Sequence, residues 1–166
     1  AANNIAAYHG RAAANVSVTA TVANIASGGL AALVTRYAKY VGFYRAGILN
    51  SSGQLFAVIQ RVSMSSTGQL TVQTLAKNSV TLSGAVTLTF ETIGTSMRLL
   101  ANGAMVASAT DSKYTGGSVG IAGTRNTTFT QFSAHATSSF TRASSVSASG
   151  SSVPSLVSRT TRRRLR

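Results

Sequence analysis

Few side chains in this sequence can act as an acid, a base or a metal ligand. The chain has two carboxylates, Glu91 and Asp111, two histidines, His9 and His135, and no cysteine. Glycosidase chemistry needs two carboxyl groups within about 5–10 Å of each other, and metal or triad chemistry needs several ligands at defined spacings. We expect Glu91 to face outward toward a basic residue and Asp111 to be a turn residue. The sequence therefore predicts no catalytic residue, no metal site, no cofactor and no enzymatic activity.

A cluster of aromatic and basic residues between positions 36 and 45 is better suited to binding. Aromatic faces stack on sugar rings or on bases, and basic neighbours favour an anionic polymer. In an alternating strand one member of each neighbouring pair faces the core, and we expect this of Phe43. The alternative is that the rings are ordinary core and surface residues. The candidate ligand contacts are Tyr37, Tyr40, Tyr44 and Arg45.

Three triplets match the acceptor pattern for N-glycosylation. They begin at Asn15, Asn50 and Asn126. Such triplets arise by chance in a chain this rich in Ser, Thr and Asn. In an exporting, glycosylating cell, Asn50 and Asn126 are the better acceptors because we expect both in loops.

Residues 87–110 predict the kind of element that positions these side chains. Apolar residues alternate with polar ones over 87–92, 95–101 and 104–110, which indicates strands with one buried face. Gly94-Thr95 and Asn102-Gly103 separate the three segments. Asn-Gly is a strong hairpin signal because both positions of a type I′ turn need positive φ. This stretch therefore predicts an antiparallel meander.

The rest of the chain repeats this pattern. Turn residues such as Ser51-Ser52-Gly53 and Ser66-Thr67-Gly68 separate neighbouring segments, and no segment has helical periodicity joined to caps. The sequence predicts an all-β fold, an antiparallel β-sandwich of two packed sheets with extended N- and C-terminal arms. The further expected strands are 16–23, 30–37, 42–50, 54–62, 69–76, 80–82, 118–122 and 128–136.

Several of these motifs also carry a family resemblance. Residues 94–112, followed by 114–121 (YTGGSVGI) and 129–132 (FTQF), are similar to the second half of a laminin-G-like, concanavalin-type jelly roll. Residues 29–37 and 43–48 resemble its paired middle strands. The resemblance implies a jelly-roll fold, whose members serve as sugar binders, adhesion modules or passive spacers. Members that bind calcium or sugar through acidic loops need several carboxylates, which this chain lacks.

Composition suits one domain with a sizeable core and a weakly charged surface. The chain has 166 residues, 44% of them hydrophobic and 10% charged, against about 25% charged in typical soluble domains. The formal net charge is +13, and residues 136–166 hold six Arg and no acid. Such a tail binds nucleic acid, an anionic polysaccharide or an anionic surface, unless it is simply solvated. No apolar run is long enough for a transmembrane helix, and the start of the sequence indicates a processed exported protein or a fragment.

The expected organisation is an arm (1–14), a sandwich (15–136) and a Ser/Thr-rich arm ending in Arg (137–166). Each arm has too few apolar residues to offset an ordering cost of about 1–2 kcal/mol per residue. Neighbouring copies of the chain could order the arms by accepting them at sheet edges. The candidate assembly contacts are Ile5, Tyr8, Phe140, Val146, Val153, Leu156, Arg162, Arg163 and Arg164.

These observations favour a non-enzymatic, extracellular or cell-surface structural subunit that self-assembles into a fibre or surface layer through its arms. The alternative is a carbohydrate-binding or adhesion module that uses the aromatic and basic cluster. A viral coat subunit with a basic arm for nucleic acid ranks third. The expected partners are copies of the chain and, in the alternative, a glycan or anionic polysaccharide.

Overall fold

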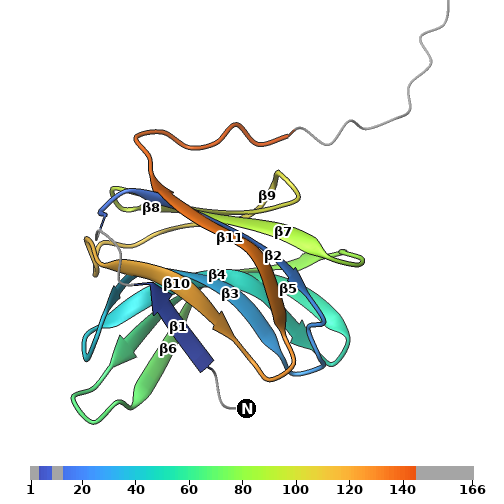
Figure 1. Cartoon of the computed structure of the whole chain (residues 1–166), viewed down its shortest axis with the longest axis horizontal. Coiled ribbons are helices and arrows are strands. Elements are labelled where there is room, and N and C mark those ends of the chain that lie inside the picture. The colour runs from blue at the N-terminus through green and yellow to red at the C-terminus, as the bar shows by residue number, and fades with distance from the viewer. Residues whose placement is uncertain (1–3, 9–12, 145–166) are drawn as a thin grey trace, which may run out of the picture.

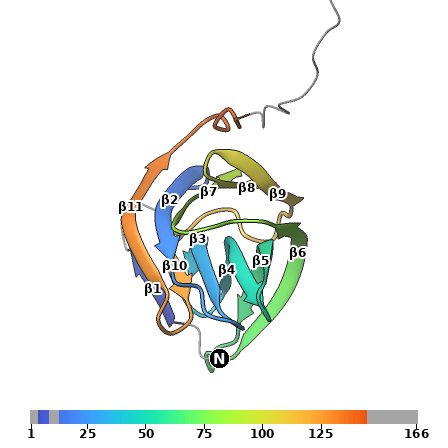
Figure 2. The same cartoon turned by 90° about the vertical axis from the view of Figure 1, so that its right-hand side faces the viewer.

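The alternating segments form two antiparallel β-sheets packed face to face (Figures 1 and 2). The computed structural model describes residues 4–8 and 13–144. One sheet has the order β1 (Asn4–Tyr8), β10 (Ser118–Gly123), β3 (Leu30–Ala38), β4 (Gly42–Ser51), β5 (Gln54–Met64) and β6 (Leu70–Val80). The other has the order β11 (Thr128–Ala136), β2 (Val16–Ala23), β7 (Val86–Ile93), β8 (Ser96–Ala101) and β9 (Ala104–Thr110). The predicted β-sandwich is confirmed.

The predicted meander is also present as β7, β8 and β9. Asn102 and Gly103 have φ values of 49° and 81°, so both occupy the left-handed region that a two-residue type I′ turn requires. Alternate residues of β7, including Leu88 and Phe90, are fully buried between the sheets. Each such side chain stabilises the fold by about 1.5–3 kcal/mol.

The predicted break between strands 69–76 and 80–82 is wrong. The expected strands at 69–76 and 80–82 are a single strand, β6, paired with β5 from Leu70 opposite Met64 to Val80 opposite Leu55. A bulge between Ile59 and Gln60 absorbs the change in alternation. Pairing with a long neighbour outweighs the local polar residues of β6.

The N-terminal segment belongs to its own sheet. β1 pairs antiparallel with β10 of the same chain, with Ile5 opposite Ala122 and Tyr8 opposite Val119. The Ile5 side chain packs against a cluster that includes Val34 and Ala122. Residues 4–8 are therefore an edge strand of the sandwich, which corrects the expectation that they form an arm reaching a neighbouring copy.

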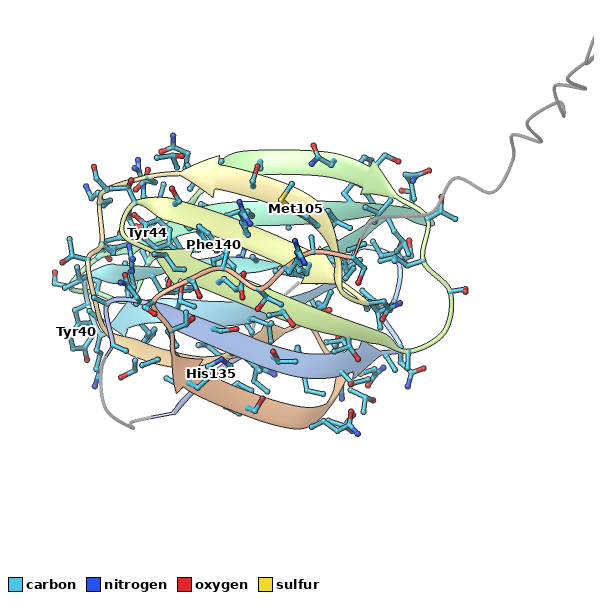
Figure 3. All side chains as sticks on the ribbon, turned by 90° about the horizontal axis from the view of Figure 1, so that it is seen from above. Tyr40, Tyr44, Met105, His135 and Phe140 are labelled. Atoms are coloured by element: carbon cyan, nitrogen blue, oxygen red, sulfur yellow. The ribbon has the colours of Figure 1, made fainter. Side chains whose placement is uncertain are left out.

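Residues 137–144 lie across the outer face of the five-stranded sheet (Figure 3). The Thr141 amide donates to both carboxylate oxygens of Glu91, at 3.0 and 3.2 Å, and its hydroxyl also donates to this group. Glu91 faces outward as expected, but it is covered, and among the described residues it forms no ion pair with a basic residue, so that part of the expectation is wrong. The Ser144 amide donates to the Gly103 carbonyl at 2.9 Å.

Phe140 packs on the same sheet face. The Arg98 guanidinium lies 4.2 Å from its ring centroid, a cation–π contact within the chain. Phe140 is thus placed against its own body. The other expected C-terminal assembly contacts, Val146, Val153, Leu156, Arg162, Arg163 and Arg164, lie outside the described residues.

Arg36 holds one end of the sandwich together. Its backbone has a positive φ of 53°, at the register shift between Thr35 and Ala38 in the pairing of β3 with β4. The guanidinium donates to the carbonyls of Ala14 (2.8 and 3.1 Å), Gly94 (2.6 Å) and Tyr114 (2.8 Å). This irregularity turns Arg36 inward and leaves Tyr37 on the opposite face of the sheet.

Candidate ligand-binding face

The outer face of the six-stranded sheet is curved. Figure 2 shows β1 and β6 extending past the middle strands on the side away from the five-stranded sheet. Val34, Phe43 and Val62 have no exposed surface, although the core between the sheets lies on the other side of these strands. We call this surface the cupped face, defined by Ala32, Val34, Tyr37, Phe43, Arg45, Gly47, Phe56, Val58, Gln60, Val62, Thr74 and Lys77.

Strand register arranges polar residues in a row across the centre of the cupped face. Arg45 of β4 pairs with Gln60 of β5, and Gln60 pairs with Thr74 of β6. Residues directly opposite each other have Cβ atoms about 4.5–5.5 Å apart, so the three side chains are in reach of one another. The Arg45 Nε donates to Gln60 Oε1 at 2.7 Å, and Gln60 Nε2 donates to Thr74 Oγ1 at 3.3 Å.

The Arg45 guanidinium is incompletely satisfied. Arg45 is 5% exposed, and its Nη1 is buried without a hydrogen-bond partner among the described residues. Burial lowers the pKa of Arg45, but an arginine side chain stays charged in proteins. Burying an unpaired charge costs several kcal/mol. This unpaired buried charge makes the cupped face the candidate site.

Small residues lie next to the polar row. Ala32, Gly47, Val58 and Lys77 are consecutive cross-strand partners on β3, β4, β5 and β6. Ala32, Gly47 and Val58 are small, so the surface of the sheet beside Arg45 is recessed. The Lys77 ammonium lies over the Phe56 ring, 4.2 Å from its centroid.

Apolar clusters flank the polar row on both sides. Phe43 packs with Val34, Val62 and Ala122, and the Tyr37 ring lies 5.7 Å from the Phe43 ring. On the other side, Leu30, Ala32 and Val58 form a cluster with Leu49 and Phe56. A polar centre between apolar walls is typical of small-molecule sites.

The structure separates the four ligand contacts predicted from the sequence. Tyr37 and Arg45 lie on the cupped face, and Tyr40 is 54% exposed in the turn between β3 and β4. Tyr44 has no exposed surface and lies in the core between the sheets, so it is removed from the set. Neighbours on a strand point to opposite faces, and Tyr44 and Arg45 therefore cannot contact one ligand together. Phe43 is buried as expected, but on the cupped face.

Sequence reasoning does not find Gln60, Thr74 or Lys77. A polar residue in the otherwise apolar run around Gln60 is a weak signal of a buried polar group. Thr74 and Lys77 have no such signal, because their place opposite β5 follows from the register of β6.

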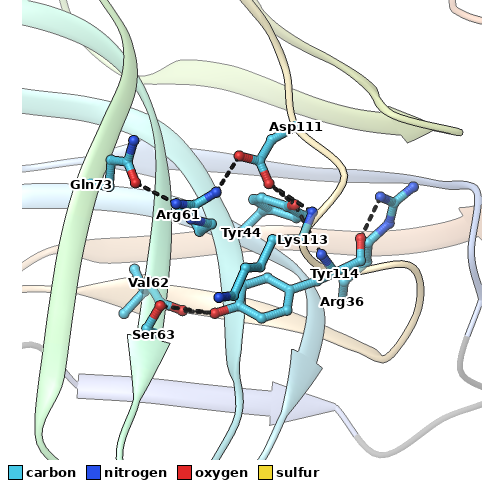
Figure 4. Close-up of polar contacts among 9 residues, drawn as sticks. All are labelled: Arg36, Tyr44, Arg61, Val62, Ser63, Gln73, Asp111, Lys113 and Tyr114. Carbon is cyan, nitrogen blue, oxygen red and sulfur yellow. Dashed lines mark hydrogen bonds and ion pairs between the residues drawn. The ribbon is translucent and has the colours of Figure 1, made fainter.

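A second polar cluster joins the two sheets at one end (Figure 4). Asp111 forms an ion pair with Arg61 at 2.5 Å and accepts a hydrogen bond from the Tyr44 hydroxyl. Burial and this hydrogen bond raise the pKa of Tyr44 to about 12. Burial alone would raise the pKa of Asp111, but hydrogen bonds from Tyr44 and the Lys113 amide, with the charge of Arg61, lower it below its usual value. Each member has a protein partner, so we assign this cluster to stability.

The lowered pKa of Asp111 predicts a loss of stability in acid. A carboxyl group with a depressed folded pKa contributes stability above its unfolded pKa, here 3.8, and loses it as the pH falls through the folded value. We expect the free energy of unfolding, measured by urea denaturation, to decline below pH about 4. Asp111→Asn should be less stable at pH 7 and show a weaker decline, and an unchanged acid profile would contradict this assignment.

The three glycosylation triplets differ in accessibility. The side-chain oxygen of Asn15 accepts from the Gly94 amide at 2.8 Å. Asn50 Nδ2, the atom that would carry the glycan, donates to the Ile25 carbonyl at 2.8 Å. Asn126 is exposed in the turn between β10 and β11. Asn126 therefore stays the better candidate, whereas Asn50 would lose a hydrogen bond on modification.

A small apolar hollow between the sheets is a weaker candidate site. Its volume is about 310 Å³, and it is lined by Ala6, Ala7, Gly120, Ile121 and Phe132. None of these side chains can orient a polar ligand. Among the described residues no group of three or more His, Cys, Asp or Glu side chains is placed to hold a metal ion, and none of the described segments forms a helix able to cross a membrane.

Comparison with solved structures supports the fold. The chain is similar to a carbohydrate binding module of Bacillus subtilis, CBM66, with a TM-score of 0.61 and 15% identity over 76% of this chain and 78% of that chain. It is also similar to sheep galectin-11, solved in complex with glycerol, with a TM-score of 0.50 and 9% identity over 81% of this chain and 96% of that chain. Both are jelly-roll-like β-sandwiches, whereas the laminin-G part of the resemblance stays a prediction. No protein-family model and no curated protein matches the sequence.

Proposed function

We propose that this protein is a non-catalytic glycan-binding module and that the cupped face receives the sugar. The observation that carries the proposal is the unsatisfied Arg45. Arg36, which is also buried, donates hydrogen bonds from its guanidinium to three backbone carbonyls. Among the residues that the structure describes, Arg45 bonds to Gln60 alone, so part of its hydrogen-bonding capacity remains for a ligand.

The chemistry of the cupped face suits a sugar. Arg45 donates, and Gln60 and Thr74 can donate and accept, which matches the hydroxyl groups of a sugar ring. The apolar clusters that include Tyr37 and Phe56 supply surface for the carbon faces of the sugar ring. Fold similarity to a carbohydrate binding module and to a galectin supports the same function. We place the protein outside the cell or on its surface, where such glycans are found.

This proposal replaces self-assembly as the preferred function. The two arms were expected to need a neighbouring copy for order, but residues 4–8 pair with β10 and residues 137–144 contact Glu91 and Gly103 of the same chain. The described parts of both arms thus have partners within their own subunit.

A glycan array probed with the full chain tests the proposal. We expect specific binding to a subset of glycans, weakened about 3- to 10-fold by Thr74→Val, the effect of losing one hydrogen bond. Thr74 is exposed on β6, so this near-isosteric change should leave the fold intact. Thr87→Val makes the same change on the outer face of the other sheet and should not alter binding. Absence of binding to every glycan, or equal effects of both variants, would refute the proposal.

A further inference from the structure

The charges on the cupped face are unbalanced. Arg45 and Lys77 both belong to this face. Of the two carboxylates in the chain, Glu91 lies on the outer face of the other sheet, bonded to Thr141, and Asp111 lies between the sheets, bonded to Tyr44 and Arg61. No carboxylate among the described residues reaches the cupped face, so its cations have no counter-charge within the described chain.

The Arg45 guanidinium is buried, but its terminal nitrogens have no hydrogen-bond partner among the described residues. Its Nε is occupied by Gln60 Oε1, which fixes the orientation of the planar group. The two terminal nitrogens remain, and paired N–H groups on one edge of a guanidinium match the two oxygens of a carboxylate. Nη1 is covered in the free protein, so pairing with this edge requires Arg45 to move from the orientation that Gln60 holds.

From this geometry we infer that the ligand is an acidic oligosaccharide whose carboxylate pairs with Arg45. The inference rests on the proposed function and names the class of sugar. Lys77 lies two strands from Arg45, a span of about 10 Å at the usual strand spacing. A chain of more than one sugar unit crossing from β4 to β6 therefore meets both cations.

Other anionic polymers fit the cupped face less well. Binding to single-stranded nucleic acid uses exposed aromatic rings on which bases stack. Here the Tyr37 ring is half-buried against Phe43, and Lys77 lies over the Phe56 ring. Both rings are thus partly covered and neither is exposed, so the cupped face offers no row of exposed rings for successive bases, whereas a carboxylate needs only the charged edge of Arg45.

A matched pair of ligands tests the inference by isothermal titration calorimetry. One is tetragalacturonate and the other is its fully methyl-esterified form, which has the same rings without the charge. We expect the acid to bind about 10- to 100-fold more tightly, the range of one charge-assisted hydrogen-bonded pair, and to lose affinity as salt increases. A sulfated tetrasaccharide should bind more weakly than the acid.

Three variants test which basic side chain pairs with the carboxylate of the ligand. Arg45→Gln should abolish the preference for the acid over the ester, and Lys77→Gln, at an exposed position, should reduce it. Arg125→Gln removes the same charge from the exposed turn between β10 and β11 and should leave both affinities unchanged. Circular dichroism confirms that each variant is folded, and Lys77→Gln alone decides the outcome if Arg45→Gln does not fold.

The outcomes separate this inference from the proposed function. Equal binding of acid and ester, or tighter binding of the sulfated sugar, would overturn the carboxylate assignment and leave glycan binding standing. A preference for the acid that persists in both Arg45→Gln and Lys77→Gln would also overturn it. Failure to bind any glycan on the array would instead remove the proposed function itself.

Discussion

Replacing Arg36 with methionine is expected to lower the free energy of unfolding by about 3–5 kcal/mol, the usual cost of removing one partner from a buried charged network. The variant keeps the apolar stem of the side chain but leaves the carbonyls of Ala14, Gly94 and Tyr114 without their donor. Methionine has no particular advantage at the positive φ of this position, so backbone strain should be similar in both proteins.

Denaturant unfolding measures this effect directly. At about 2–4 °C per kcal/mol for a chain of this size, the melting temperature should fall by roughly 10 °C. Arg125→Met is the control because Arg125 is exposed, and it should change stability by about 0.5 kcal/mol or less. Similar losses in the two variants would show that the three carbonyls do not depend on Arg36.

Replacing Gly47 with alanine is expected to destabilise the protein by about 3 kcal/mol, the upper part of the range for an overpacked site. A Cβ atom here would lie 2.5 Å from the Ala32 Cα and closer still to the Ala31 carbonyl oxygen. Both are backbone atoms of the neighbouring strand, so β3 and β4 would have to separate. Because Gly47 pairs with Ala32 and Val58 on the floor of the cupped face, glycan affinity should also fall.

Gly116→Ala is the matched control for this change. A Cβ at Gly116 would have its nearest heavy atom, the Ala14 Cα, at 4.0 Å. Unfolding curves should therefore show a loss for Gly47→Ala and little change for Gly116→Ala. Equal stability of the two variants would mean that the two strands can adjust at low cost.

Local pattern and turn chemistry were sufficient to predict most of the sandwich. The Asn102-Gly103 turn and the alternation around Leu88 and Phe90 depend on residues close in the sequence, and both are confirmed. β1 could not be predicted in this way, because its partner β10 is more than 100 residues away and its own residues are mostly small. The polar residues of β6 predict a break in this strand, and only its pairing with β5 shows that it is continuous.

The candidate site was predicted only in part for the same reason. Arg45 could be selected from its type and its aromatic neighbours, but alternation should already have excluded Tyr44 as its companion. Gln60 and Thr74 join Arg45 through register across two strand pairs, which no local pattern encodes. The partner of Glu91 was not predicted because it comes from a segment some 50 residues later.

The path of residues 137–144 gives the domain a front and a back. Ser144, the last residue that the structure describes, is bonded to Gly103 on the side opposite the cupped face. An attachment made beyond Ser144 would leave from the back, so the cupped face would point away from the support. An attachment made at the β1 end would instead start at one margin of the cupped face, because β1 is an edge strand of this sheet.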